Sequence, residues 1–182
     1  MKRDDIKKSS VKRLRRAEDI PAVLYGGGRK SESIYVKASD FYTIIRKIKP
    51  GRLSTTIFEL LYGNEVLKAL VRDIHYHTTN YLILHIDFGV IEQDKPIHVN
   101  VPIVLTGEAD CVGVKLGGLL RQLIRALRVS CLPKHIPSEF VIDVQPMNLE
   151  DYKRLSDIEL PKEVRPLAKM NEIAVTVAKQ VA

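Results

Sequence analysis

A histidine and an aspartate lie two residues apart on a segment that otherwise has the pattern of a buried strand. Residues 82–88 read Leu-Ile-Leu-His-Ile-Asp-Phe. The strict alternation predicts a strand that places His85 and Asp87, together with Ile83, on the face opposite the core. An imidazole and a carboxylate at fixed spacing on a rigid strand can donate and accept hydrogen bonds. The core face is expected to consist of Leu82, Leu84, Ile86 and Phe88.

The preceding segment, 66–76, is a second candidate strand, joined to the first through a turn at Thr78–Asn80. A hairpin closed at this turn would set Asp73 opposite His85 and His75 opposite Ile83, with Leu70 and Ile74 on the core side. The polar face of the hairpin would then carry Asp73, His75, His77, Tyr81, His85 and Asp87.

Three of these histidines raise the alternative of a metal-dependent hydrolase. His75 and His77 form a His-x-His pair that puts both rings on one strand face, and His85 and Asp87 would complete a ligand set. No further His, Asp or Glu pattern supplies supporting groups around such ligands, and no nucleophile elbow or activated cysteine is present. The favoured prediction is therefore a non-enzymatic protein with no cofactor, no metal and no small-molecule substrate.

The charge distribution points to an anionic partner. The chain has a formal net charge of +7 and a pI of about 9.4, and residues 1–30 hold ten Lys/Arg against four Asp/Glu. A concentrated basic segment is typical of nucleic-acid binding. Arg15 and Arg16 can neutralise phosphates, while His85 and Asp87 can read base edges and 2′-hydroxyls in the wide minor groove of RNA. We therefore expect the strand with His85 to form the floor of an RNA-binding surface and the basic N-terminus its rim. That segment either stays mobile until it binds or is pinned to the body by Val11 and Leu14.

The two cysteines, Cys111 and Cys131, form no CxxC motif and are too few for a disulfide framework or a thiolate zinc site. They indicate reduced thiols in a cytosolic protein. No apolar run approaches the ~18 residues of a membrane span, and the N-terminus has no signal-like apolar region. We expect a soluble, cytoplasmic protein with no membrane partner.

The expected elements predict a mainly β chain, in which a small α+β barrel with helices is followed by an all-β C-terminal domain. The charged, proline-containing segment 92–96 divides domain 1–93 from domain 94–182. Residues 119–127 fit a helix and a strand about equally. Strands are expected over 20–25, 33–36, 56–62, 66–76, 82–88, 97–105, 127–131, 140–144 and 173–178, and a helix from Ser39 to Ile48.

Several short motifs, in this order and spacing, resemble the bacterial large-subunit ribosomal protein family that binds 5S rRNA. The resemblance is to its long, two-domain form, the general stress protein CTC, and it covers nearly the whole chain. The motifs are Arg15-Arg16, Ile20–Gly26 and Leu84–Phe88 in the first domain, and Val101-Pro102, Gly107-Glu108, 112–118, 131–133 and Ile136-Pro137 in the second.

This resemblance implies a six-stranded barrel that docks on the loop E region of 5S rRNA. The chain would be a structural, ribosome-associated component of the large subunit, with its C-terminal domain available to neighbouring ribosomal proteins. The alternative within the family is a stress-response RNA-binding factor that associates with ribosomes transiently. His75 stands where the family usually has Gln, and Glu18-Asp19 where Gly or a basic residue is usual. The RNA contacts implied by the resemblance are Arg3, one or both of Arg15 and Arg16, Tyr25, His85 and Asp87. His75, in place of the Gln, is expected to bind RNA as well.

Overall fold

The computed structural model describes residues 8–63 and 65–179 of the chain, which divides into two compact units, Met1–Lys95 and Pro96–Ala182. We refer to them as the N-domain and the C-domain. The division falls inside the charged segment 92–96. The prediction of a mainly β chain, with helices in the N-domain and strands dominating the C-domain, is confirmed.

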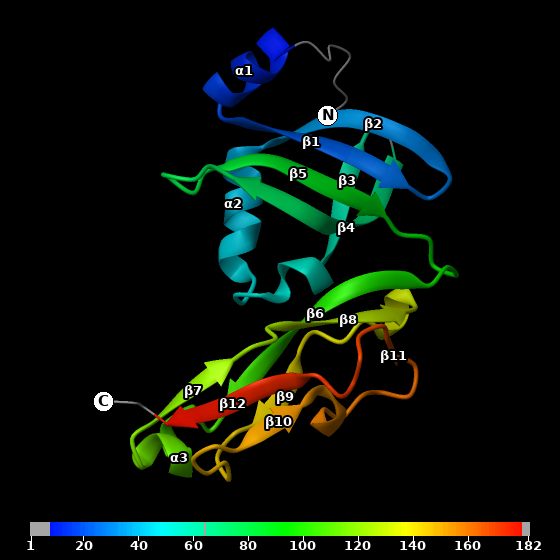
Figure 1. The fold of residues 1–182 in the computed structure, drawn as a ribbon. Coiled ribbons are helices and arrows are strands. Elements are labelled where there is room, and N and C mark those ends of the chain that lie inside the picture. Colours follow the sequence, from blue (N-terminus) through cyan, green and yellow to red (C-terminus); the bar gives the residue numbers. More distant parts are fainter. Residues whose placement is uncertain (1–7, 64, 180–182) are drawn as a thin grey trace. The chain divides into compact units, whose positions relative to one another are not determined.

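In the described part of the N-domain, five strands form one curled, half-barrel sheet in the order β2-β1-β5-β4-β3 (Figure 1). The family resemblance implied six. Strand β1 pairs with β2 in antiparallel and with β5 in parallel orientation. The N-domain elements are α1 (Lys8–Arg16), β1 (Asp19–Gly26), β2 (Arg29–Lys37), α2 (Ala38–Lys47), a 3-10 turn (Arg52–Thr55), β3 (Ile57–Tyr62), β4 (Glu65–Tyr76) and β5 (Ile83–Val90).

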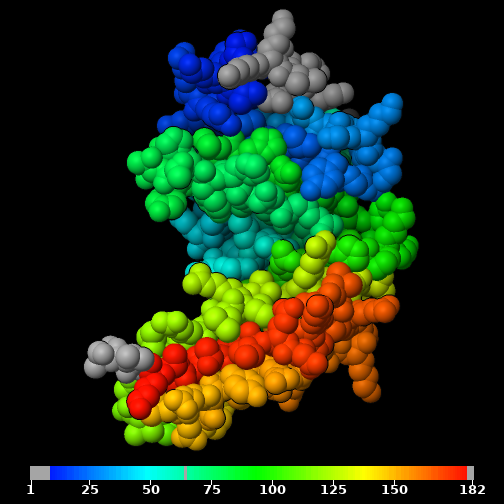
Figure 2. Space-filling model, in the orientation of Figure 1, coloured from blue at the N-terminus to red at the C-terminus, as the bar shows by residue number. Residues whose placement is uncertain are grey.

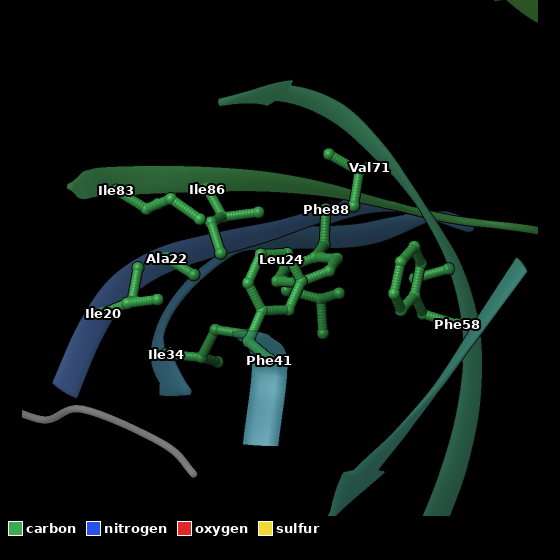
Figure 3. Close-up of a cluster of buried hydrophobic side chains, with 11 residues drawn as sticks. Ile20, Ala22, Leu24, Ile34, Phe41, Phe58, Val71, Ile83, Ile86 and Phe88 are labelled. Atoms are coloured by element: carbon green, nitrogen blue, oxygen red, sulfur yellow. The ribbon is translucent and has the colours of Figure 1, made fainter. Parts of the chain in front are cut away.

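The concave side of this sheet encloses the core of the N-domain (Figure 3). Phe41 projects from α2 onto the sheet, with its ring centroid 5.9 Å from that of Phe58 on β3 and 6.2 Å from that of Phe88 on β5. The rings of Phe58 and Phe88 are 6.3 Å apart, and all three contacts are tilted or edge-on. Such geometry is favourable for aromatic rings. The Tyr42 hydroxyl, also on α2, accepts a hydrogen bond from the backbone N–H of Ile83 at 3.1 Å. Helix α2 thus both fills the core and holds the start of β5.

Polar contacts link β2, at one edge of the curled sheet, to the strands β3 and β4 on its other side. The Tyr62 hydroxyl on β3 donates a hydrogen bond to the Glu32 carboxylate on β2. Arg29 at the start of β2 lies 2.7 Å from the Glu65 carboxylate at the start of β4, and this bond raises the pKa of the guanidinium. These contacts connect opposite sides of the half-barrel.

The predicted pairing of the hairpin is wrong for two reasons: the strands already pair one residue out of the expected register next to the turn, where Tyr76 lies opposite Ile83, and both strands carry a bulge. His75 lies opposite His85 and Asp73 opposite Asp87, and the pairing shifts at Arg72 on β4 and at Leu84 on β5. An extra residue in one strand reverses the alternation of faces beyond it. The buried residue at the start of β5 is therefore Ile83, where Leu82 and Leu84 were predicted. Leu82 is 54% exposed and Leu84 is half-buried.

The C-domain consists of two sheets in the part that the structure describes, of order β10-β12-β7 and β11-β8-β6-β9. Residues 119–127, for which the sequence allowed a helix or a strand, are mostly strand, because β7 and β8 contain most of them. Cys111 and Cys131 are buried free thiols, and burial raises the pKa of Cys131. The C-domain elements are β6 (Ile97–Thr106), α3 (Val112–Lys115), β7 (Gly118–Gln122), β8 (Ala126–Cys131), β9 (Phe140–Asp143), β10 (Tyr152–Arg154), β11 (Arg165–Pro166) and β12 (Ile173–Lys179), with 3-10 turns at Glu108–Asp110, Pro133–His135 and Leu155–Asp157.

Candidate nucleic-acid interface

The convex side of the N-domain sheet, which we call the outer face, gathers the predicted polar residues from three neighbouring strands. Because Ala22 and Leu24 of β1 and Ile86 and Phe88 of β5 are in the core, the residues between them point outward. Pairing places Val23 beside Asp87 and Tyr25 beside Gly89. It also places Asp73 and His75 of β4 beside Asp87 and His85 of β5. The outer face thus carries Tyr25, Asp73, His75, His85 and Asp87.

Two His–Asp pairs lie side by side on this face. The His85 Nδ1 atom is 2.8 Å from Asp87 Oδ1, and the His75 Nε2 atom is 3.1 Å from Asp73 Oδ2. The rings of His75 and His85 meet edge to face, 6.1 Å apart. The His85 and Asp87 side chains are 29% and 31% exposed, about half the exposure of the other pair. The His85–Asp87 pair is therefore the less exposed of the two pairs.

The contact with Asp87 fixes what His85 can offer to a partner. A carboxylate at Nδ1 keeps a proton on that nitrogen and sets the ring orientation. Nε2 then remains as the atom for an external hydrogen bond. The second oxygen of Asp87 is a further acceptor. The pair presents a ring nitrogen and a carboxylate oxygen on a strand whose backbone is held on both sides by β1 and β4.

Arg15 connects the basic helix α1 to this face. Its guanidinium donates a hydrogen bond to the backbone carbonyl of Leu84 at 3.0 Å. Leu84 is the bulged residue of β5, which has no pairing partner on β4. The bond therefore holds a positive charge at the residue that precedes His85. Figure 2 shows the blue atoms of the N-terminal region close to the green atoms of the β4–β5 segment.

Of the two alternatives for the basic N-terminal segment, the described residues favour the pinned one. Residues Lys8–Arg16 form a helix whose Ser10 is buried and whose Val11 and Leu14 are half-buried. Arg16 is exposed and has no hydrogen-bond or ion-pair partner within residues 8–63 and 65–179. Arg3 lies outside the described residues.

The turn after α1 contains a strained residue. Glu18 has a φ of 58°, in the left-handed region, and its carbonyl accepts a hydrogen bond from the N–H of Ala38 at 3.2 Å. Helices commonly end in this conformation with glycine, because glycine has no Cβ to oppose it. The sequence signal was Glu18-Asp19, which stands where Gly or a basic residue is usual in the family that the chain resembles.

We expect Glu18→Gly to raise the free energy of unfolding of the chain by about 0.5–1 kcal/mol, because it removes the left-handed strain of a residue with a side chain. Urea unfolding followed by circular dichroism measures the change. The matched control is Glu18→Ala, which removes the same charge and keeps the Cβ. If both variants gained equally, the charge and not the backbone conformation would be the cause.

The metal-site alternative does not fit this geometry. His77 follows β4 in a turn where its Nδ1 accepts a hydrogen bond from the N–H of Thr79 at 3.3 Å. Across the described residues, 8–63 and 65–179, no three His, Cys, Asp or Glu side chains converge on a position that would hold a metal ion. In the same part of the chain, no helix is long and apolar enough to cross a membrane.

A residue that the sequence reasoning missed is Arg72, the bulged residue of β4. Its side chain lies over Gly89, so that a Cβ added at Gly89 would be 2.7 Å from Arg72 Nε and 3.2 Å from Cγ. The signal in the sequence was Gly89 itself, because a glycine inside a strand often marks a bulge or a close approach.

A polar sheet face bordered by a basic helix is typical of a protein that binds nucleic acid. The model of the ribosomal L25p family matches residues 1–88, and that of the ribosomal protein TL5 C-terminal domain matches residues 96–181. The large ribosomal subunit protein bL25 of Chlamydia abortus is 44% identical over 178 residues, covering 98% of this chain and 96% of the relative. The corresponding proteins of Chlamydia muridarum and Chlamydia pneumoniae are 42% and 40% identical with the same coverage.

The chain therefore belongs to the bL25 family of large ribosomal subunit proteins, in the long form with two domains. It is a structural component of the ribosome and not an enzyme. This finding corrects the metal-dependent hydrolase alternative built on His75, His77, His85 and Asp87.

Proposed function

We propose that the N-domain binds 5S rRNA, in the region of loop E, and thereby attaches the chain to the large ribosomal subunit. The observation that carries the proposal is the His85–Asp87 pair, 2.8 Å apart on the outer face. The predicted residues Tyr25, His75, His85 and Asp87 all lie on this face. The resemblance to the 5S rRNA-binding family assigned RNA contacts to the same positions.

The pair suits the minor groove of an RNA helix, which is wide, shallow and lined with 2′-hydroxyls. His85 Nε2 and the second oxygen of Asp87 sit on a rigid strand and can bond base edges or hydroxyl groups. A carboxylate normally repels phosphates. Its bond to the His85 imidazole gives Asp87 an orienting role that justifies its place on an RNA-facing surface.

The helix α1 provides the electrostatic part of the interface. Its last turn carries Arg13, Arg15 and Arg16, and Arg15 is tied to the carbonyl of Leu84 beside His85. A guanidinium held in this way needs no further ordering when it meets a phosphate. Arg16 is the exposed member that we assign to the backbone of the RNA. The helix thus positions the RNA, and the outer face reads it.

The test is a binding titration of the full chain with 5S rRNA and with an unrelated RNA duplex of the same length, at matched salt concentrations. We expect at least about tenfold tighter binding to 5S rRNA, because specific complexes exceed generic electrostatic binding. Equal affinity for both RNAs would contradict the proposal. A 5S rRNA variant with a regular duplex in place of loop E should bind like the unrelated RNA.

A further inference from the structure

At Gly89 the outer face lacks a side chain, and the side chain of another residue covers the position. Phe88 faces the core, so a side chain at the next position of β5, Gly89, would lie on the outer face. The Arg72 side chain lies over it, with Nε, Cγ and Cδ at 2.7, 3.2 and 3.5 Å from the position that a Cβ would occupy. Any larger residue at position 89 would force Arg72 to move.

The bulge in β4 explains how Arg72 reaches this place. Val71 pairs with Phe88 and Asp73 pairs with Asp87, so Arg72 is the extra residue between them. Without a bulge, Val71 and Asp73 would share one face. With it, Val71 faces the core and Asp73 the outer face. Bulges are frequently found where a strand redirects a side chain toward a functional surface.

Arg72 lies among the residues assigned to RNA recognition. Gly89, which it covers, pairs with Tyr25 on β1. Asp87 precedes Gly89 by two residues on the same face of β5, and Asp73 follows Arg72 on β4. Arg72 therefore adds a guanidinium to a face that also carries the carboxylates of Asp73 and Asp87. Arg72 is exposed, so it supplies positive charge where an RNA backbone would approach.

We propose that Arg72 is a further RNA-binding residue of the outer face, which contacts a phosphate of the bound RNA, and that Gly89 is its positioning residue. The inference rests on the proposed function, because it uses the same face and the same class of ligand. The planar guanidinium of arginine, with its fork of N–H donors, is well suited to a phosphate.

Four variants of the full chain test the inference by titration with 5S rRNA at several salt concentrations. Arg72→Ala should weaken binding roughly tenfold. It should also make the negative slope of log K against log salt shallower by about 1. Gly89→Ala, which keeps the net charge, should weaken binding through displacement of Arg72. The double variant should bind like Arg72→Ala, within about twofold, since both changes remove one contact. Lys134→Ala, in the C-domain, removes the same charge and should leave binding unchanged within about twofold.

Unchanged affinity and salt slope for Arg72→Ala would overturn the inference. So would a Gly89→Ala effect that persists in full in the Arg72→Ala background, because it would show that Gly89 acts without Arg72. Thermal unfolding of each variant identifies a loss of folding. Failure of the proposed function is a different result, in which wild type itself does not prefer 5S rRNA.

Discussion

Alanine at Asp87 is expected to weaken 5S rRNA binding by about 1–3 kcal/mol, roughly 5- to 150-fold, although it removes a negative charge from an RNA-binding protein. General electrostatics predicts the opposite sign, because one carboxylate fewer reduces repulsion from phosphates. The reason for the expected loss is geometric. Asp87 Oδ1 lies 2.8 Å from His85 Nδ1 and orients the ring. His85→Ala should produce a loss of similar size.

A double-mutant cycle separates this explanation from two independent contacts. If Asp87 acts partly through His85, the double variant His85→Ala/Asp87→Ala should lose less than the sum of the single losses, with a coupling of about 0.5–3 kcal/mol. Filter binding at one fixed salt concentration gives all four affinities. Glu159→Ala, an exposed carboxylate of the C-domain, is the charge control and should bind at least as well as wild type. Equal or tighter binding by Asp87→Ala would contradict the role of the pair.

Phe88→Ala is expected to have the largest effect on stability, with a loss of about 3–5 kcal/mol in the free energy of unfolding. Phe88 is fully buried and contacts the rings of both Phe41 and Phe58. Truncation leaves a cavity between helix α2 and the sheet, which neither aromatic neighbour can fill without losing its own contacts.

Urea unfolding with circular dichroism measures this loss, and hydrogen exchange at the amides of β1 and β5 localises it to the N-domain. Leu61→Ala is the control, since Leu61 is 79% exposed on β3 and should change stability by less than about 0.5 kcal/mol. A loss below about 1 kcal/mol for Phe88→Ala would mean that the three rings do not form the centre of the core.

The strands of the N-domain could be predicted from alternation, turn residues and length, because those signals are local. The pairing between strands could not. The bulge at Leu84 leaves no clear mark in the residue types around it, and Gly89 is the one sign of the bulge at Arg72. The bulge at Leu84 places Ile83 in the core and leaves Leu82 in solvent. Helix α1 was also uncertain from the sequence, because its apolar side is only Val11 and Leu14.

The candidate site divides in the same way. His85 and Asp87 could be chosen because they interrupt an apolar strand pattern, and they remain on the same face in the structure. The bond from Arg15 to the Leu84 carbonyl joins residues 69 positions apart. It also depends on the bulge at Leu84, which the residue types do not predict. Arg72 was missed for the same reason, since its place over Gly89 requires knowledge of both strands.

The parallel pairing of β1 with β5 constrains the order in which the N-domain can fold. Ala22 pairs with Ile86, so most of the N-domain sequence lies between the two partners. The antiparallel pairs β1–β2 and β3–β4 are joined by short turns and can form early, whereas the central pair must first close a long loop. During synthesis, the inner edge of β1 stays unpaired until β5 has left the ribosome. The Arg15–Leu84 contact can form only at that last step. A nascent chain therefore gains its RNA-recognition surface together with its closed sheet, which delays recognition of RNA until the N-domain sequence is complete.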